Sequence, residues 1–154
     1  MATNNHSVVY LGADHAGFAL KEQVAGWLTD HGYEVRDLGA STMVPDDDYP
    51  TIADTVARAV VKDQARGLLF CGSAEGVCIV ANKTDGVRAA IGFSVDAARA
   101  TRSDEDANVL CLPGRMMSAE EAMPIVETFL ETPFSGSERH ARRLKQIKKL
   151  EDRN

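Results

Sequence analysis

The chain has 154 residues, of which 44% are hydrophobic and 26% are charged, and its net charge is −6. This composition is too apolar for a disordered chain, and no apolar run approaches the roughly 18 to 20 residues that span a bilayer. We therefore expect a single domain over 1–154 with no membrane partner, a flexible N-terminus at 1–6, and a basic C-terminal helix and tail at 138–154.

Predicted strands and helices alternate along the chain. Short apolar runs rich in β-branched residues indicate strands, and apolar residues three to four positions apart indicate helices. In chain order we predict strand 7–12, helix 16–30, strand 33–38, a helix containing 52–60, strand 67–71, helix 77–83, strand 87–92, helix 94–102, strand 108–112, and helices 118–131 and 138–150. This alternation predicts an α/β fold in which helices cover both faces of a parallel sheet.

Several predicted helix ends carry their own signals. We predict Gly32 as the C-cap of the first helix and Ser94 as the N-cap of the fourth. Ser118 and Glu121 have the spacing of a capping box.

Charge is distributed unevenly along the sequence. Residues 139–153 carry a net charge of +5, which leaves −11 on the rest of the chain. The acidic body argues against general nucleic-acid binding. The basic segment suits a phosphate group or an acidic partner surface, although charge alone favours a solvated helical face.

The cysteine count and the N-terminus both bear on the compartment. Three cysteines, an odd number, argue against a disulfide framework. The N-terminal residues lack a basic start followed by an apolar stretch, so we expect no secretory signal. Together these features indicate a reducing, cytoplasmic environment.

Ligands of open parallel sheets bind beyond the carboxyl ends of the strands. This rule selects the loops 13–17, 39–48, 71–76, 93–94 and 113–115. The predicted loop 103–106 precedes the fifth strand and therefore falls at the opposite edge. We interpret the acidic run 46–48 as a solvated loop rather than a metal site. The three cysteines also lack the paired spacing of a zinc site.

Cys71 is the most suggestive residue in these loops. It ends an apolar strand and precedes a glycine turn that leads into a helix. The positive end of the helix dipole favours a thiolate there, and the backbone N–H groups of the turn can bind a developing oxyanion. The alternative is a small core residue that closes the strand. The turn fits neither a Walker motif nor a cysteine phosphatase, which would need arginine where Val77 stands.

Two further groups of polar residues are candidates for binding or catalysis. Asp14 and His15 follow the first strand, where an acid beside an imidazole can orient a hydroxyl or transfer a proton. Their alternative is an N-capping aspartate beside a surface histidine. The cations that suit phosphate are Arg115, Arg139, His140, Arg142 and Arg143.

A set of short motifs extends from residue 7 to about 147. They are 12–17 (GADHAG), 48–50 (DYP), 71–73 (CGS) with Gly76, 81–83 (ANK), 86–89 (GVRA), 106–110 (DANVL), 114–115 (GR), and Arg139 and His140 with Arg143. In order and spacing this set resembles the ribose-5-phosphate isomerase B family, which includes galactose-6-phosphate isomerase subunits.

The resemblance implies a Rossmann-like three-layer sandwich with a five-stranded parallel sheet, and a C-terminal helix that packs on a partner subunit. It implies a homodimer or a dimer of dimers with shared active sites, and neither a metal nor an organic cofactor. The implied reaction interconverts ribose 5-phosphate and ribulose 5-phosphate through an enediolate. The alternatives are an isomerase of another aldose phosphate, such as a hexose 6-phosphate, and a non-catalytic sugar-phosphate binding protein.

The resemblance also implies residue roles. Cys71 matches the base that moves a proton between carbons 1 and 2; members with a glutamate base carry it where Val77 stands here. The matching substrate-binding residues are Asp14, His15, Tyr49, Gly72, Ser73 and Gly76. The matching phosphate-binding residues, some of them from the partner subunit, are Arg115, Arg139 and Arg143, with His140 beside them.

Two segments depart from the family pattern. Glu75 interrupts the small-residue turn, and we expect it to contact substrate or solvent. Asp104 and Glu105 stand where many members have a ring-opening histidine and an asparagine. We expect Asp104 or His15 to open the sugar ring unless the substrate differs, and Glu105 to bind the substrate.

Overall fold

The computed structural model describes residues 8–153, so the expected flexible segment 1–6 and the predicted strand start at residue 7 lie outside the described residues. The elements are β1 (Val8–Ala13), α1 (Phe18–Asp30), β2 (Glu34–Asp37), α2 (Tyr49–Asp63), β3 (Arg66–Cys71), α3 (Glu75–Ala81), β4 (Ala89–Ile91), α4 (Val95–Glu105), β5 (Val109–Pro113), α5 (Ala119–Glu131) and α6 (Glu138–Glu151). Their type and order along the chain confirm the predicted alternation.

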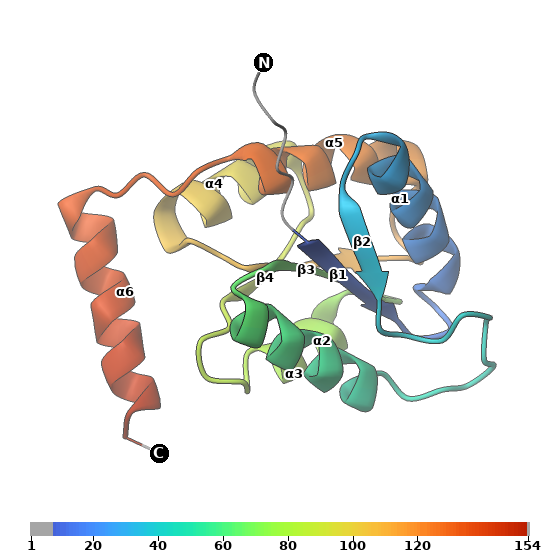
Figure 1. Ribbon diagram of the computed structural model, residues 1–154, viewed down its shortest axis with the longest axis horizontal. Coiled ribbons are helices and arrows are strands. Elements are labelled where there is room, and N and C mark those ends of the chain that lie inside the picture. Colours follow the sequence, from blue (N-terminus) through green and yellow to red (C-terminus); the bar gives the residue numbers. More distant parts are fainter. Residues whose placement is uncertain (1–7, 154) are drawn as a thin grey trace.

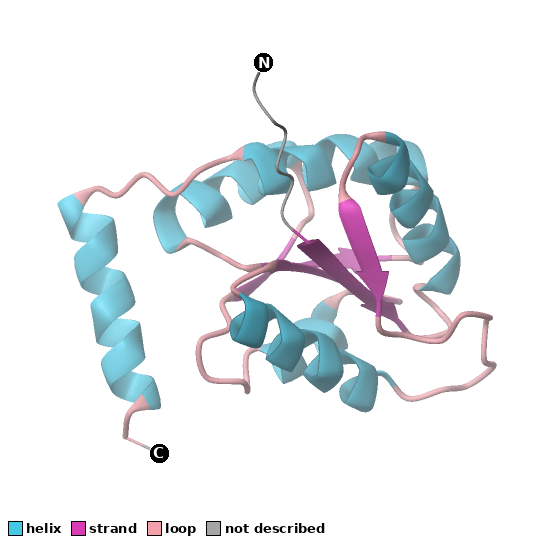
Figure 2. Cartoon of the chain, in the orientation of Figure 1, coloured by secondary structure: helices cyan, strands magenta, loops and turns pink. Residues whose placement is uncertain are grey.

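The strands form one parallel sheet in the order β2-β1-β3-β5-β4. Figure 2 shows the strands between the surrounding helices. The chain leaves β1 toward one edge through β2 and then crosses to the other side through β3. The order therefore reverses between β1 and β3, which is where open sheets of this kind bind ligands. Ala13 pairs with Phe70, and Cys71 pairs with Pro113, so these three central strands end together.

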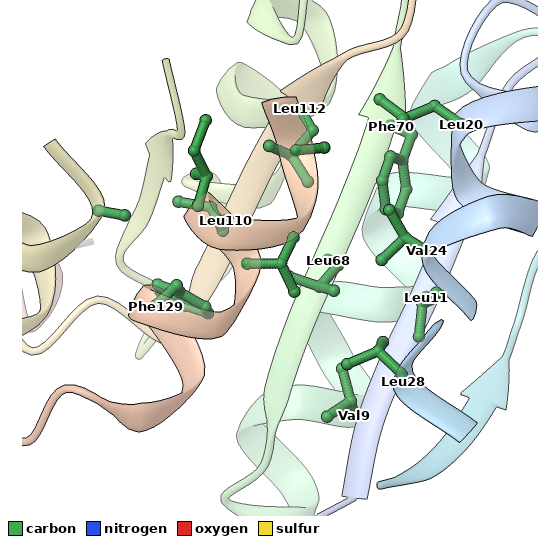
Figure 3. Packing of buried hydrophobic residues seen from close by; sticks show 14 of the residues in the cluster. Val9, Leu11, Leu20, Val24, Leu28, Leu68, Phe70, Leu110, Leu112 and Phe129 are labelled. Carbon is green, nitrogen blue, oxygen red and sulfur yellow. The ribbon is translucent and has the colours of Figure 1, made fainter. Parts of the chain in front are cut away.

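Helices cover both faces of the sheet, which confirms the predicted three-layer sandwich (Figure 1). Alternate residues of a strand point to opposite faces, so Leu68 and Leu69 of β3 belong to two different apolar clusters. Leu68 packs in the layer covered by α1, α4 and α5, which Figure 3 shows with Val24 and Phe129. Leu69 packs in the layer covered by α2 and α3.

The predicted N-caps at Ser94 and Ser118 are confirmed, whereas the C-cap of α1 is His31 and Gly32 follows it with a φ of 85°. Several helix limits differ from the predicted ones, including the start of α1, which lies at residue 18 rather than 16. The Ser94 and Ser118 side chains accept hydrogen bonds from the N–H groups of Ala97 and Glu121, at 3.0 and 3.2 Å. Helix α4 continues to Glu105, so the predicted loop 103–106 is wrong and residues 103–105 form the last turn of the helix. Arg102 stabilises this turn, because its Nη1 donates to Asp106 Oδ1 at 2.8 Å and to the Ala107 carbonyl at 2.7 Å.

Helix α3 begins at Glu75 rather than at the predicted residue 77. Ala74 precedes it with a φ of 67°, in the left-handed region. This conformation costs a non-glycine residue about 1 kcal/mol, and the fully buried Ala74 methyl holds the turn in place from inside. The turn after β3 is thus only three residues long.

Helix α6 stands at one side of the molecule, joined to α5 by the loop 132–137 (Figure 1). Its contacts with the body include His140, which is buried beside α4, and Glu151, whose Oε1 accepts a hydrogen bond from the Gly86 N–H at 2.9 Å. Between these contacts a cavity of 580 Å³ separates Ile147 and Leu150 from the edge strand β4.

Two glycines at the start and middle of α1 give a stability prediction. A Cβ on Gly17 would lie 2.4 Å from the carbonyl carbon of Phe70, which cannot move without disturbing β3, whereas a Cβ on Gly26 would meet nothing within 4 Å. Gly17→Ala is expected to lower the free energy of unfolding by about 3 kcal/mol. Gly26→Ala is expected to raise it by about 0.5 to 1 kcal/mol. Denaturant unfolding of both variants measures the contrast, and similar effects of the two changes would contradict it.

Candidate active site

A cavity of 470 Å³ opens at the carboxyl ends of β1, β3 and β5. The loops after these strands supply most of its wall, and α2 and α3 supply the rest. The lining residues are Asp14, His15, Ala16, Tyr49, Cys71, Gly72, Ser73, Glu75, Gly76, Ile79, Arg115 and Met116. The strand-end rule therefore predicted where this candidate site lies, and the cavity brings together predicted residues from four different segments.

The loop after β1 is held tightly to its neighbour β3. The Asp14 N–H donates to the Phe70 carbonyl at 3.2 Å, and Asp14 Oδ1 accepts from the Gly17 N–H at 3.0 Å. Asp14 is buried in the loop that precedes α1. Its hydrogen bond to Gly17 shapes this loop, but the N-cap residue of α1 is Gly17, so the alternative of an N-capping aspartate is wrong, and Asp14 also lines the cavity. His15 is the next residue along this wall.

Cys71 lies at the end of β3, buried but in contact with the cavity. The residues 72–74 form a turn that connects Cys71 to α3. The backbone amides of this turn therefore have no partner in a neighbouring strand. Among residues 8–153, the backbone N–H groups of Gly72, Ser73 and Ala74 donate no hydrogen bond to another residue. A thiol thus stands beside three unsatisfied backbone donors, the arrangement that stabilises an oxyanion.

The loop after β5 closes over this turn. The Gly114 N–H donates to the Cys71 carbonyl at 2.7 Å, and the Arg115 N–H donates to the Gly72 carbonyl at 3.1 Å. The Arg115 side chain lies across Gly72, because a Cβ on that glycine would be 3.1 Å from Arg115 Nη1. The guanidinium therefore adds a positive charge directly over the cysteine turn.

Tyr49 and Glu75 form the outer part of the wall. The Tyr49 ring packs over Gly76, where a Cβ would lie 2.5 Å from the ring carbon Cζ. Glycine at this position allows the aromatic ring to lie against α3 and face the cavity. Glu75 is exposed at the rim, where it can meet both solvent and a bound ligand.

His15 is held by Asp47, a residue of the loop between β2 and α2. Asp47 Oδ1 accepts a hydrogen bond from the His15 backbone N–H at 2.6 Å and lies 3.1 Å from the ring Nδ1. Hydrogen bonding to the Asp47 carboxylate raises the pKa of His15 above its ordinary value, and the nearby charge of Asp14 acts in the same direction. The interpretation of 46–48 as a purely solvated loop is therefore wrong for Asp47.

Five predicted site residues lie elsewhere. Asp104, Glu105, Arg139, His140 and Arg143 are absent from the cavity wall and gather where α4 meets the start of α6. There His140 Nε2 is 3.8 Å from Asp104 Oδ1, and His140 Nδ1 is 2.7 Å from the Ser135 hydroxyl. Figure 1 shows α6 on the opposite side of the molecule from the loop 39–48. The expected position of 103–106 at the other edge of the sheet is thus confirmed.

In this group of residues between α4 and α6, the arginines have no acidic partner among the described residues. Arg139 and Arg143 are exposed one turn apart on α6, and within 8–153 neither has an ion pair or side-chain hydrogen bond. Most arginines in the body have such partners; Arg102, for example, contacts Asp106. Two free guanidinium groups on one helical face can hold a phosphate bidentately.

Sequence reasoning missed two residues that shape the site. Asp47 is one, and Lys21 is the other: its fully buried Nζ lies 2.6 Å from Asp37 Oδ2 and donates to the Ala40 carbonyl at 3.0 Å. Lys21 thereby fixes the start of the loop that carries Asp47. A lysine on the apolar face of the first predicted helix, next to Leu20, was the available signal.

The described residues 8–153 contain no group of three or more histidine, cysteine or acidic side chains arranged to hold a metal ion. The same residues include no helix with the length and apolar character needed to cross a bilayer. All three cysteines are free thiols.

Comparisons with known proteins identify the family of this chain and agree with its fold. The family model described as Ribose/Galactose Isomerase matches residues 9–147. A ribose-5-phosphate isomerase B from Mycobacterium leprae is 40% identical over 144 residues, which are 93% of this chain and 89% of that protein. A ribose 5-phosphate isomerase structure from Thermotoga maritima is similar with a TM-score of 0.89 and 42% identity, covering 94% of this chain and 99% of that one.

A second solved structure, ribose-5-phosphate isomerase B from Mycoplasma genitalium with bound ribulose-5-phosphate, has a TM-score of 0.91 and 38% identity and covers 96% of this chain and 97% of that one. The fold, which has a cavity at its switch point, is that of an α/β enzyme. The chain belongs to the ribose/galactose isomerase family and is an isomerase, which confirms the resemblance seen in its motifs.

Proposed function

We propose that the protein interconverts ribose 5-phosphate and ribulose 5-phosphate, with Cys71 as the base. One observation carries the proposal: the buried Cys71 thiol faces a cavity beside the unsatisfied amides of Gly72, Ser73 and Ala74. Its relatives from Mycobacterium leprae and Mycoplasma genitalium, which bear the name ribose-5-phosphate isomerase B, support the choice of sugar.

The proposed chemistry moves hydrogen within one molecule. The Cys71 thiolate removes the proton from carbon 2 of the open-chain aldose, and the C–H electron pair forms the C1–C2 double bond while oxygen 1 takes the negative charge. The turn amides donate to this enediolate oxygen. The thiol then returns the proton to carbon 1 while the proton on oxygen 2 passes to oxygen 1, so that the carbon 2 carbonyl and the carbon 1 hydroxyl of the ketose form and the thiolate is regenerated. No electrons leave the sugar, so no redox cofactor is needed.

Phosphate binding is proposed to involve two copies of the chain. Arg115 is the only arginine of the cavity wall within 8–153, whereas Arg139 and Arg143 stand exposed and unpaired on the far side. A second copy that brought its α6 against the cavity would add two guanidinium groups and desolvate the site. We therefore propose a homodimer, or a dimer of dimers, in which each site combines one copy's cavity with the other copy's α4–α6 cluster.

We propose that the sugar ring is opened either by His15 or by Asp104 from a second copy of the chain. His15 belongs to the cavity wall in the same chain as Cys71. Asp104 reaches a cavity only if a second copy supplies it, because in its own chain it lies beside His140. The same second copy would also place its Glu105 and His140 next to the cavity.

Proton NMR of ribose 5-phosphate in heavy water with the purified protein tests the proposed reaction. We expect ketose signals to appear and the carbon 2 proton signal of the aldose to disappear, because the base exchanges its proton with solvent. A sample without protein is the control. If neither conversion nor exchange occurs with ribose 5-phosphate, the pentose assignment is wrong, and hexose 6-phosphates are the next substrates to measure.

A further inference from the structure

The contact between Asp47 and His15 joins two loops that are 32 residues apart in the sequence. The same carboxylate oxygen, Asp47 Oδ1, lies 2.6 Å from the His15 backbone nitrogen and 3.1 Å from its ring Nδ1. The Asp47 carbonyl oxygen adds a third contact, 3.3 Å from Nδ1. Both side chains are mostly enclosed, with exposed fractions of 30% for His15 and 17% for Asp47.

These contacts determine which ring nitrogen carries the proton. A carboxylate and a backbone carbonyl can only accept hydrogen bonds, so Nδ1 must be the donor toward Asp47. The other nitrogen, Nε2, has no hydrogen-bond partner among residues 8–153, and His15 lines the cavity. The neutral ring therefore presents an acceptor to a ligand, and the protonated ring presents a donor.

We propose that Asp47 is a positioning residue for His15, fixing the orientation and the Nδ1–H tautomer of the imidazole so that Nε2 acts on the bound sugar. The catalytic part of this inference rests on the proposed isomerase function. The part that concerns the tautomer and the orientation of His15 does not rest on that function, because it describes the ligand-free protein.

The surroundings of Asp47 support a fixed position. Lys21 anchors the loop at its start through Asp37 and Ala40, and α2 begins two residues after Asp47, at Tyr49. Within the loop the Asp47 N–H donates to the Val44 carbonyl at 3.4 Å. The loop that carries Asp47 is thus fixed at both ends. A fixed position is what a residue needs if it is to orient another side chain.

The charged groups around His15 set the direction of its titration. Asp14 and Asp47 both raise the pKa of His15 above 6.5, and Asp47 acts chiefly through its hydrogen bond. The other ionisable groups of the cavity wall are Cys71 and Glu75 on the β3–α3 side, Arg115 from the β5 loop, and Tyr49 from α2. With its pKa raised, His15 is more protonated near neutral pH and is a better proton donor at Nε2.

Nitrogen-15 NMR of the histidine rings in the ligand-free protein tests the first part directly. We expect the wild type to show the Nδ1–H tautomer at His15, and Asp47→Asn to lower the His15 pKa and increase the Nε2–H tautomer. Asp46→Asn is the matched control, because it removes the same charge from the same loop. Asp46 is exposed, and asparagine tolerates its positive φ of 58°. An unchanged His15 titration and tautomer in Asp47→Asn would overturn the proposal.

Kinetics with ribose 5-phosphate test the second part. Asp47→Asn is expected to lower kcat about tenfold to a hundredfold, the range typical of partners that orient a functional histidine, and to shift the acidic limb of the pH profile. Asp46→Asn is expected to retain wild-type kcat. Wild-type kcat in an Asp47→Asn variant whose His15 tautomer has changed would overturn the catalytic role. If the wild type itself has no activity on this sugar, the proposed function fails, while the NMR result still decides the positioning.

The same contact predicts a pH-dependent stability. Because the folded-state pKa of His15 is raised, its stabilisation by Asp47 is complete below about pH 6.5 and is lost as the pH rises through the folded pKa. Asp47→Asn is therefore expected to lower Tm more at pH 6 than at pH 9. An equal loss at both values would indicate a loop contact without the proposed effect on His15.

Discussion

Cys71→Ser is expected to lower kcat for ribose 5-phosphate by about 10³-fold, with a much smaller change in KM. The serine hydroxyl has nearly the shape of the thiol but does not ionise near neutral pH, so the base is removed while the wall of the cavity remains. Heavy-water NMR on the variant should show loss of carbon 2 proton exchange together with loss of ketose formation. Loss of both together would identify Cys71 with the proton transfer itself.

Cys78→Ser is the matched control for this experiment. Cys78 lies on α3 outside the cavity wall, half-buried, with its Sγ 3.5 Å from the Ala89 carbonyl, which a serine hydroxyl can also reach. We expect near wild-type kcat from this variant and a Tm within about 4 °C of wild type for both. A Cys71→Ser variant that is folded and retains most of its activity would exclude Cys71 as the base.

Mixing two inactive variants is expected to restore activity if each site draws on two copies of the chain. Cys71→Ser damages the cavity, and Arg143→Ala damages the exposed basic face of α6, so each homodimer should lose both of its sites. A mixed dimer keeps one site with both parts intact. Random reassortment should then recover about one quarter of the wild-type activity after unfolding and refolding together.

The control for this experiment is a pair of variants that are both altered in the cavity wall. Arg115→Ala, like Cys71→Ser, alters the cavity wall, so a mixture of these two variants should contain no intact site and recover nothing. Size measurement of the mixtures verifies that copies have exchanged. Exchange without recovery in the Cys71→Ser and Arg143→Ala mixture would show that α6 does not complete the cavity of a second copy.

The fold could be predicted because its determinants are local and repeat along the chain. β3 is almost wholly apolar between turn signals, and α5 has both an apolar face and a capping box, so neither depends on distant contacts for its assignment. Two of the helix ends that were predicted incorrectly, the start of α3 and the end of α4, lie next to residues in the left-handed region. Ala74 and Asp106 adopt this conformation without being glycine, and no local signal in the sequence marks it.

The cavity could also be predicted, since strand ends follow from the strands. Asp14, Cys71 and Arg115 meet because β1, β3 and β5 are neighbours, and a parallel sheet brings their ends to one edge. The contact of Asp47 could not be predicted in this way. It depends on the path of a loop without regular structure, whose start is held by the hydrogen bond from Lys21 Nζ to the Ala40 carbonyl. The residues of the α4–α6 cluster were assigned to the site only through the family resemblance, because within one chain they lie apart from the cavity.

The glycines beneath the cavity determine which parts of this protein can evolve toward another sugar. A Cβ on Gly17 would collide with Phe70, and one on Gly114 would lie 2.5 Å from the Ala16 carbonyl oxygen, so the floor consists of backbone in direct contact with backbone. The rim differs: Ile79 and Met116 are 61% and 71% exposed and can be exchanged without disturbing a core. A library for altered substrate range should therefore vary these rim side chains and leave the floor unchanged.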